Sequence, residues 1–303
     1  MRAWGRFGYV ALFLVGLVLT LKITGCSTAN LTSNTMPLAA VAPLENPKLP
    51  DWIEQISPLG EANPTAQIRV RFKEALIPVE QLESKDQQAL LEKFALTPPL
   101  PGKFRFLTPR MVGFQADQAT PKATRVQVTL KAGLADLKNH RLDKDLTWTF
   151  NTEPIKLSNL PGSPPAGTSG NQESSPFDIK PVLKITSNTE LDPASLQESW
   201  QLTALGQQNS VPLKVEWQQE ETKPAEVSPE ETFDVSDRTW TYIAEPRQTL
   251  AKATRYQLKI VPGLRSAKGN MPSESVFASQ IETYSPLAFQ KLGFYGQPDA
   301  GGA

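Results

Sequence analysis

The sequence feature that most constrains the fold is an internal repeat. Residues 122–128 read KATRVQV, and 130 positions later residues 252–258 read KATRYQL. The same offset aligns Gly133 with Gly263, and one inserted residue then aligns Thr152 with Thr283. Such self-similarity indicates two copies of one folding unit in tandem. Chance similarity of two strands rich in Thr and Lys is the alternative.

The turns that follow the repeated segments are also aligned. Lys138-Asn139-His140 corresponds to Lys268-Gly269-Asn270, so that Asn139 lies opposite Gly269. Asn and Gly accept positive φ more readily than other residues, which predicts a tight turn with a left-handed residue in both copies.

The dominant period on either side of the chain's midpoint is two, as in half-buried strands. Apolar and polar residues alternate over 67–72, 125–130 and 255–260, and further candidate strands contain Trp148 with Phe150 and Leu213 with Val215 and Trp217. Inward residues such as Val126, Val128 and Leu130 would fill a core between two sheets. The predicted fold class is therefore all-β, with two tandem β-sandwich domains.

One segment favours a helix. Between positions 79 and 94 the apolar residues are spaced as one uneven stripe, and Pro78 before it suits a helix start. The stripe consists of Val79, Leu82, Leu90, Leu91 and Phe94. We expect one short helix on a β framework.

The first residues are typical of a bacterial signal peptide. Arg2 and Arg6 precede an apolar run over 9–21, which is shorter than the roughly 20 residues that span a bilayer. The run leads into Ile23-Thr24-Gly25-Cys26, which resembles the lipobox of bacterial lipoproteins. The resemblance implies cleavage before Cys26, a lipid anchor on Cys26, and a membrane-anchored lipoprotein that faces the periplasm or the cell surface. An uncleaved signal anchor with a passive Cys26 is the alternative.

Composition divides the rest of the chain. Two stretches rich in Ser, Pro, Gly or Asn predict a tether and a linker between folded units. The expected organisation is a signal peptide over 1–25, a flexible tether over 26–51, a first β-sandwich domain over 52–156, a linker over 157–176, a second β-sandwich domain over 177–288, and a tail or the start of a truncated further segment over 289–303. An acidic, Pro-containing insertion over 218–231 predicts a solvated loop in the second domain.

The charges and the scarcity of Cys and His exclude several function classes. The 31 basic and 31 acidic residues give no net charge, which argues against nucleic-acid binding. Cleavage before Cys26 would remove Arg2, Arg6 and Lys22 and leave a mildly acidic chain. A single Cys forbids an internal disulfide and a Cys-rich zinc site, and a single His leaves little room for His-based catalysis.

No spacing of ionisable residues predicts an active site. His140 lies in an expected turn, and the carboxylates weighed as acid–base or Ca²⁺ candidates are Glu92, Asp117, Asp136, Asp143 and Asp145. They lack the spacing and the central Gly of a calcium loop, and Gly162 and Gly167 lie in the linker rather than in a phosphate loop. Five tryptophans are predicted to be core or strand residues rather than platforms for sugar stacking: Trp52, Trp148, Trp200, Trp217 and Trp240. We expect no catalytic residue, cofactor or metal site.

The first repeat resembles a known family. Its markers are ISPLG over 56–60, a strand ending in Phe72, GKFRF over 102–106, the KATR strand, and TWTFNT over 147–152. Together they are similar to the bacterial Ig-like domain of S-layer-type surface proteins and of the N-terminal region of bacterial alpha-2-macroglobulins. The second repeat departs from this pattern in its middle.

The lipobox together with the tandem favours the alpha-2-macroglobulin branch of this resemblance. The resemblance implies a protease trap, in which cleavage of a bait region triggers a conformational change and, in many members, a Cys-Leu-Glu-Gln thioester binds the protease. The only Cys here is Cys26, and whole members are several times longer, which predicts an N-terminal fragment or a truncated gene product.

The expected function is therefore that of a non-catalytic, lipid-anchored portion of an endopeptidase inhibitor, which acts as a membrane-proximal spacer and scaffold. Its expected partners are the membrane, through lipid on Cys26, and proteases, through the remainder of the protein, with no nucleic acid. The alternative is a stand-alone Ig-like adhesion or structural module of the cell envelope.

Overall fold

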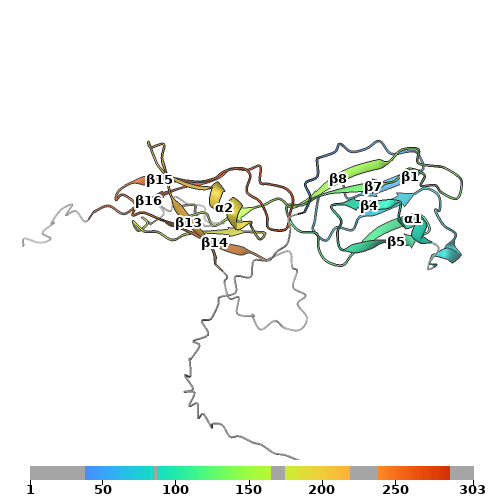
Figure 1. Ribbon diagram of the computed structural model, residues 1–303, viewed down its shortest axis with the longest axis horizontal. Helices are drawn as coiled ribbons and strands as arrows, with labels where there is room; N and C mark the ends of the chain where they lie inside the picture. The colour runs from blue at the N-terminus through green and yellow to red at the C-terminus, as the bar shows by residue number, and fades with distance from the viewer. Residues whose placement is uncertain (1–37, 83, 85–86, 165–174, 219–237, 287–303) are drawn as a thin grey trace, which may run out of the picture. The chain divides into compact units, whose positions relative to one another are not determined.

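The computed structural model describes residues 38–82, 84, 87–164, 175–218 and 238–286, and all of them belong to one compact unit, Thr35–Ala303. Cys26, Gly167 and the core of the acidic insertion, 219–231, lie outside the described residues. The described chain is nearly all β, with four four-stranded sheets and only short helical pieces (Figure 1). The predicted all-β fold class is confirmed.

The first sandwich packs two sheets face to face. One sheet has the order β1-β3-β6-β5, made of Ile53–Ser57, Arg69–Phe72, Met111–Ala116 and Gly102–Thr108. The other has the order β2-β8-β7-β4, made of Gly60–Ala62, Leu146–Thr152, Arg125–Leu130 and Phe94–Thr97. All pairings are antiparallel except β2 with β8.

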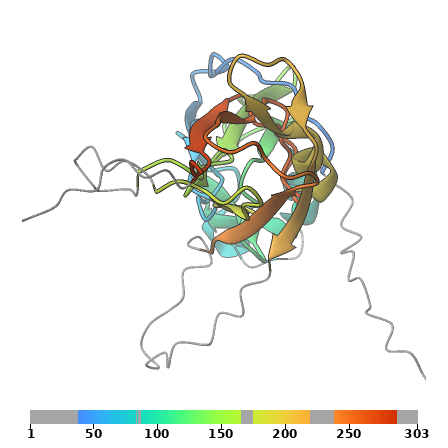
Figure 2. The ribbon, with the colours of Figure 1, turned by 90° about the vertical axis from the view of Figure 1, so that its left-hand side faces the viewer.

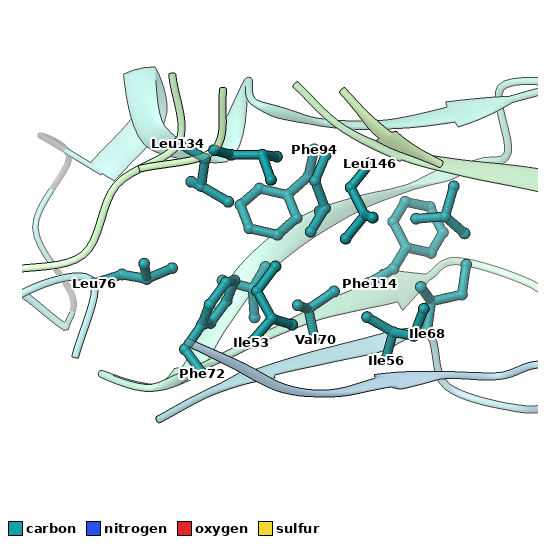
Figure 3. Close-up of a cluster of buried hydrophobic side chains, with 14 of the residues drawn as sticks. Ile53, Ile56, Ile68, Val70, Phe72, Leu76, Phe94, Phe114, Leu134 and Leu146 are labelled. Carbon is teal, nitrogen blue, oxygen red and sulfur yellow. The ribbon is translucent and has the colours of Figure 1, made fainter. Parts of the chain in front are cut away.

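Alternation along these strands creates the first core. Val126, Val128 and Leu130 of β7 are fully buried, while the residues between them are partly exposed. Figure 3 shows Ile53, Val70 and Phe72 of the first sheet facing Phe94 and Leu146 of the second. Trp52 stacks on Phe72 with ring centroids 5.5 Å apart. In β3 and β7 the period-two pattern therefore predicts the inward face of the strand correctly.

The second sandwich repeats this arrangement (Figure 2). One sheet has the order β13-β14-β10-β9, made of Leu213–Gln218, Trp240–Pro246, Leu183–Ser187 and Leu157–Ser158. The other has the order β12-β11-β15-β16, made of Ser210–Val211, Trp200–Ala204, Arg255–Ile260 and Phe277–Glu282. Residues 157–158, expected in the linker, thus form the edge strand β9.

The second core is separate from the first. Its fully buried members include Leu183, Ile185, Leu202 and Leu258. Tyr242 lies among them, and its hydroxyl accepts a 2.6 Å hydrogen bond from the backbone N–H of Leu191. Burial away from water raises the pKa of the Tyr242 phenol, so this hydroxyl stays neutral.

Each repeat has its own threonine whose hydroxyl bonds to the backbone at the start of the repeated strand, here called a threonine clamp. The two clamps explain the alignment of Thr152 with Thr283. Thr152 Oγ1 accepts a hydrogen bond from Thr124 N at 2.9 Å and donates to the Pro121 carbonyl at 2.7 Å. Thr283 Oγ1 accepts from Thr254 N at 3.1 Å and donates to the Ala251 carbonyl at 2.6 Å. Each clamp bonds the start of the repeated strand to the end of the neighbouring strand, β7 to β8 in the first repeat and β15 to β16 in the second.

The helix expected between positions 79 and 94 does not form. Val79–Gln81 is one turn of 3₁₀ helix (η1), Gln88–Leu91 is one α-helical turn (α1), and Phe94 already begins β4. Val79 is 70% exposed, whereas Phe94 is buried between the sheets. The apolar stripe was therefore not a single helical face, because its last residue belongs to a strand. The longer helix, Pro193–Ser199 (α2), is capped by Asp192 and was not predicted.

The end of the expected tether contacts the first sandwich. Leu44 donates its N–H to Thr149 Oγ1 at 3.0 Å, and Val41 O lies 3.4 Å from Arg125 Nη1. Leu49 packs against the first core. Residues 38–50 therefore follow β7 and β8 on the first sandwich.

Candidate functional site: the joint between the repeats

Asn270 joins the second sandwich to the first. Its Oδ1 accepts a 2.7 Å hydrogen bond from Arg125 N, and its Nδ2 donates to Arg125 O at 3.0 Å. The strand β4 pairs with β7 only as far as Gln127, so this side-chain amide satisfies both backbone groups of Arg125 beyond the end of β4. Nδ2 also donates to the Ala39 carbonyl at 2.7 Å. One amide therefore holds together both repeats and the segment that precedes them.

Gly269 allows the backbones to approach at this joint. A Cβ atom on Gly269 would lie 2.3 Å from the Ala123 carbonyl oxygen and 2.6 Å from that of Lys122. Met271 N donates to the same Ala123 oxygen at 2.9 Å. The expectation that Gly269 and its counterpart Asn139 both adopt positive φ is half right, since Asn139 has φ 65° but Gly269 is not left-handed. The glycine is needed for space, not for its conformational freedom.

Lys122 and Ala123 form the backbone corner that the turn around Gly269 contacts. Ala123 has a left-handed φ of 55°, which costs a non-glycine residue roughly 1–2 kcal/mol. Its methyl group is fully buried and packs with the second core, together with Ile155. Burial of the methyl group therefore offsets part of the strain. Lys122 forms a 3.1 Å ion pair with Glu153, which directly follows β8 near the end of the first repeat. Hydrogen bonds from Lys156 and Lys122 hold the pKa of Glu153 below its ordinary value, against the effect of burial.

Gly269→Ala is expected to open this joint. The new methyl group would meet backbone atoms that cannot rotate away, so the Met271–Ala123 hydrogen bond should break. Hydrogen exchange at the Met271 and Arg125 amides should speed up by roughly tenfold or more, while amides of β8 and β14 keep their protection.

Glu274→Ala is the matched control, because Glu274 is exposed five residues further along the same loop. Unchanged exchange at Met271 in Gly269→Ala would show that the close approach does not hold the repeats together.

His140 occupies the equivalent turn of the first repeat, and it is exposed there as expected. Its Nδ1 lies 2.7 Å from Oδ2 of Asp136, whose side chain is fully buried. Asp136 Oδ1 also accepts the backbone N–H groups of Lys138 and His140 at 2.9 Å each. Burial disfavours the carboxylate, but these hydrogen bonds outweigh it and hold the pKa of Asp136 below its ordinary value. The carboxylate thus organises the turn.

Asp136→Asn should destabilise the first sandwich by roughly 1–3 kcal/mol at pH 7, because the backbone N–H groups of Lys138 and His140 lose a charged acceptor. A carboxylate whose pKa is lowered by folding stabilises the protein above its unfolded pKa, and this contribution disappears as the pH falls through the folded pKa. The difference between wild type and variant in urea unfolding should therefore shrink below about pH 3.8, the ordinary pKa of the carboxyl group. Asp143→Asn, at an exposed position, is the control; a difference independent of pH would contradict the assignment.

The remaining candidate carboxylates do not converge with one another. Asp145 Oδ1 accepts the Ala132 N–H at 2.8 Å, and Asp117 lines an open groove of about 570 Å³ between 64–69 and 114–120, whose lining contains no His or Cys. Within the described ranges, no three His, Cys, Asp or Glu residues gather as a metal site. Trp52, Trp148 and Trp200 are buried as expected, and Trp217 is half exposed but lies on a strand, β13, as the alternation predicted. In the part of the chain that the structure describes, no helix is both long and apolar enough to cross a bilayer.

The fold and the joint define a class: tandem β-sandwich repeats, docked through a Gly-Asn turn of one repeat on a backbone corner of the repeat before it. The chain is similar to a much longer protein, an alpha-2-macroglobulin homolog of Nostoc sp. (strain PCC 7120), with 59% identity over 286 residues. The aligned part is 94% of this chain and 15% of that relative, so the chain spans about one seventh of the relative's length. No family model matches the sequence.

Solved structures give no further information. An L,D-transpeptidase from Mycobacterium tuberculosis is 16% identical over 33% of this chain and 39% of its own, with a TM-score of 0.24. L,D-transpeptidase 3 from the same organism is 11% identical over 55% of this chain and 62% of its own, also with a TM-score of 0.24. TM-scores this low carry no argument about the present chain.

Proposed function

We propose that this chain is a membrane-proximal part of an alpha-2-macroglobulin-like endopeptidase inhibitor. The observation that carries the proposal is the 59% identity to an alpha-2-macroglobulin homolog over almost the whole chain. Identity at this level is spread over both sandwiches, so it does not come from one short motif. The stand-alone adhesion module is not favoured, because the relative is a far longer protein.

In this proposal the chain is a non-catalytic scaffold. The protease-trapping parts belong to the rest of the protein, which in the relative is about 85% of the length. The two sandwiches set the distance and the orientation of those parts. Asn270 and Gly269 support this role, because a joint made of several backbone contacts resists bending more than a free linker does.

The anchor in this proposal is lipid on Cys26, with the protein facing the periplasm or the cell surface. The support is the lipobox-like sequence before Cys26 and the basic residues Arg2 and Arg6. The contact of Leu44 with Thr149 also supports a spacer role, because it would hold the end of the expected tether against β8. Two or three acyl chains would give stable anchoring.

Protease trapping is tested with the full-length gene product. The protein is incubated with trypsin, and the remaining activity is measured on a large protein substrate and on a small peptide substrate. A trap should suppress cleavage of the large substrate and spare the small one, whereas the 303-residue chain alone should suppress neither. Activity on the large substrate equal to that of the buffer control would overturn the trapping role.

Anchoring is tested separately with Cys26→Ser. The substitution should abolish incorporation of radiolabelled palmitate and prevent cleavage before position 26, so the precursor should keep its full length. Ser27→Ala is the control and should still be labelled. A labelled product of mature size in Cys26→Ser would contradict the anchor, and absence of label in the unmutated protein would favour the uncleaved signal anchor.

A further inference from the structure

The second repeat carries a corner with the same geometry as the one that receives the Gly269 turn. Lys252-Ala253-Thr254-Arg255 has the same sequence as Lys122-Ala123-Thr124-Arg125. Ala253 is left-handed like Ala123, with φ 47° against 55°. Ala253 N donates to Tyr284 O at 3.0 Å, as Ala123 N donates to Glu153 O at 2.7 Å. The two corners therefore present the same carbonyl groups in the same backbone conformation.

The two corners differ in what covers them. Ala123 is fully buried against the second core, and its carbonyl accepts the Met271 N–H. Ala253 is exposed, as are Lys252 and Arg255 beside it. Among the described residues, no backbone N–H reaches the Ala253 carbonyl. Docking on another repeat accounts for the burial of the first corner, and the second corner lacks that burial.

Backbone strain points the same way. A left-handed alanine costs about 1–2 kcal/mol relative to a glycine, and such strain persists where the surroundings offset it. At Ala123 the buried methyl group provides that offset. At Ala253 the methyl group is exposed, so within the described residues the strain is not offset. A partner that buries the Ala253 methyl group would restore the balance.

The close approach at the first corner defines what can dock on the second. A side chain at the position of Gly269 would collide with both corner carbonyls. The first repeat has Asn139 at the aligned position, so its turn does not fit, and a second copy of this chain cannot use it. The turn of the second repeat is already docked on Ala123. The fitting partner is therefore another repeat with a glycine at this place in its turn.

We propose that the corner formed by Lys252 and Ala253 is the docking site for a third β-sandwich repeat, which contacts it through a glycine-containing turn aligned with 268–270. The inference rests on one element of the proposed function, that this chain is part of a longer protein, and not on protease trapping. Tandem docking through corners of the same sequence and backbone conformation would make each repeat fix the direction of the next.

The two corners are not identical in every contact. Arg125 O accepts from the side chain of Asn270, whereas Arg255 O already accepts the N–H of Leu205 at 2.9 Å. Lys122 pairs with Glu153, whereas Lys252 Nζ lies 5.7 Å from the centre of the Tyr284 ring. Docking on the second corner therefore depends on the Ala253 carbonyl and methyl group more than on an Asn side chain.

A fusion chain tests the docking directly. Residues 153–303 are added a second time after Thr283, which places a copy of the second repeat after the second corner with the natural spacing. With alanine methyl groups labelled by ¹³C, a soluble paramagnetic agent reports the exposure of each one. In the 303-residue chain the agent should broaden the methyl resonance of Ala253 strongly and that of Ala123 weakly. The fusion chain contains Ala253 twice, and the one before the added copy is measured. Its methyl resonance should be broadened severalfold less than in the 303-residue chain, while the resonance of exposed Ala116 in β6 stays unchanged.

The matched variant carries Gly269→Ala in the added copy only. In it, the broadening of the Ala253 resonance before the added copy should return to its value in the 303-residue chain. Folding of the added copy is checked by its own Tyr242, whose buried ring gives a dispersed resonance. An added repeat that folds while Ala253 stays as exposed as in the 303-residue chain would overturn the docking site. Severalfold protection that persists in Gly269→Ala would also overturn it, because the contact would not use the turn.

A second measurement needs no added repeat. In the 303-residue chain Ala253→Gly relieves strain without losing a buried contact, so the melting temperature of the second sandwich should rise by about 2–4 °C. Ala123→Gly loses a buried methyl group and should not raise it. Equal decreases for both substitutions would show that Ala253 is already satisfied in this chain, and they would contradict the proposal.

Discussion

Trp148→Ala is expected to lower the unfolding free energy of the first sandwich by about 3–5 kcal/mol. Trp148 is fully buried at the centre of the first core, on β8 opposite Val128 of β7. Truncation would leave a cavity and would also remove the hydrogen bond from Trp148 Nε1 to Pro58 O at 3.1 Å. Because that carbonyl would lose its donor, the cost should fall at the upper end of the range.

Urea unfolding followed by circular dichroism measures this loss, and Trp217→Ala is the matched control. Trp217 is also a strand tryptophan, on β13, but it is 50% exposed. Its removal should cost less than about 1 kcal/mol, because little apolar area leaves water there on folding. Equal losses for the two variants would contradict the assignment of Trp148 to the core.

Gly162→Ala is expected to destabilise the second sandwich by roughly 2–5 kcal/mol. Gly162 has φ +79°, which is strained for alanine by about 1–2 kcal/mol. A Cβ atom at this position would also lie 1.8 Å from the Gln280 carbonyl oxygen on β16. Relief of that collision requires a backbone shift, which adds about 1–3 kcal/mol.

Gly206→Ala separates the two costs. Gly206 has a similar φ of +85°, but no atom lies within 4 Å of the place that its Cβ would take. Its substitution should show the conformational cost alone, measured as the shift of the second sandwich's thermal transition. A Gly162→Ala shift no larger than that of Gly206→Ala would mean that 159–164 does not pack on β16.

The strands could be predicted well because their signal is local. In β7 and β15 each apolar residue faces a core and each polar residue faces outward, and this period is visible in any six residues. The prediction of a helix over 79–94 was wrong for a related reason. Short apolar spacings around Leu90 and Phe94 fit a helical stripe as well as a turn followed by a strand, and only packing between the sheets distinguishes them.

The joint could be predicted only in part. The alignment of Thr152 with Thr283 indicated a shared element, and both residues form the same clamp. Gly269 was noticed but explained by the wrong property, because sequence does not show which backbone approaches a glycine. Asn270 gave no signal at all, since its partners Arg125 and Ala39 are 145 and 231 positions away in sequence.

By itself, then, the sequence determined that this chain folds into two related all-β units, because period and repeat are properties of neighbouring residues. Tertiary structure decided how the units are used. Two corners with the same KATR sequence have different environments, since Ala123 meets the turn of the next repeat while Ala253 is exposed. Burial depends on what another part of the protein brings to a site, and no local pattern contains that information.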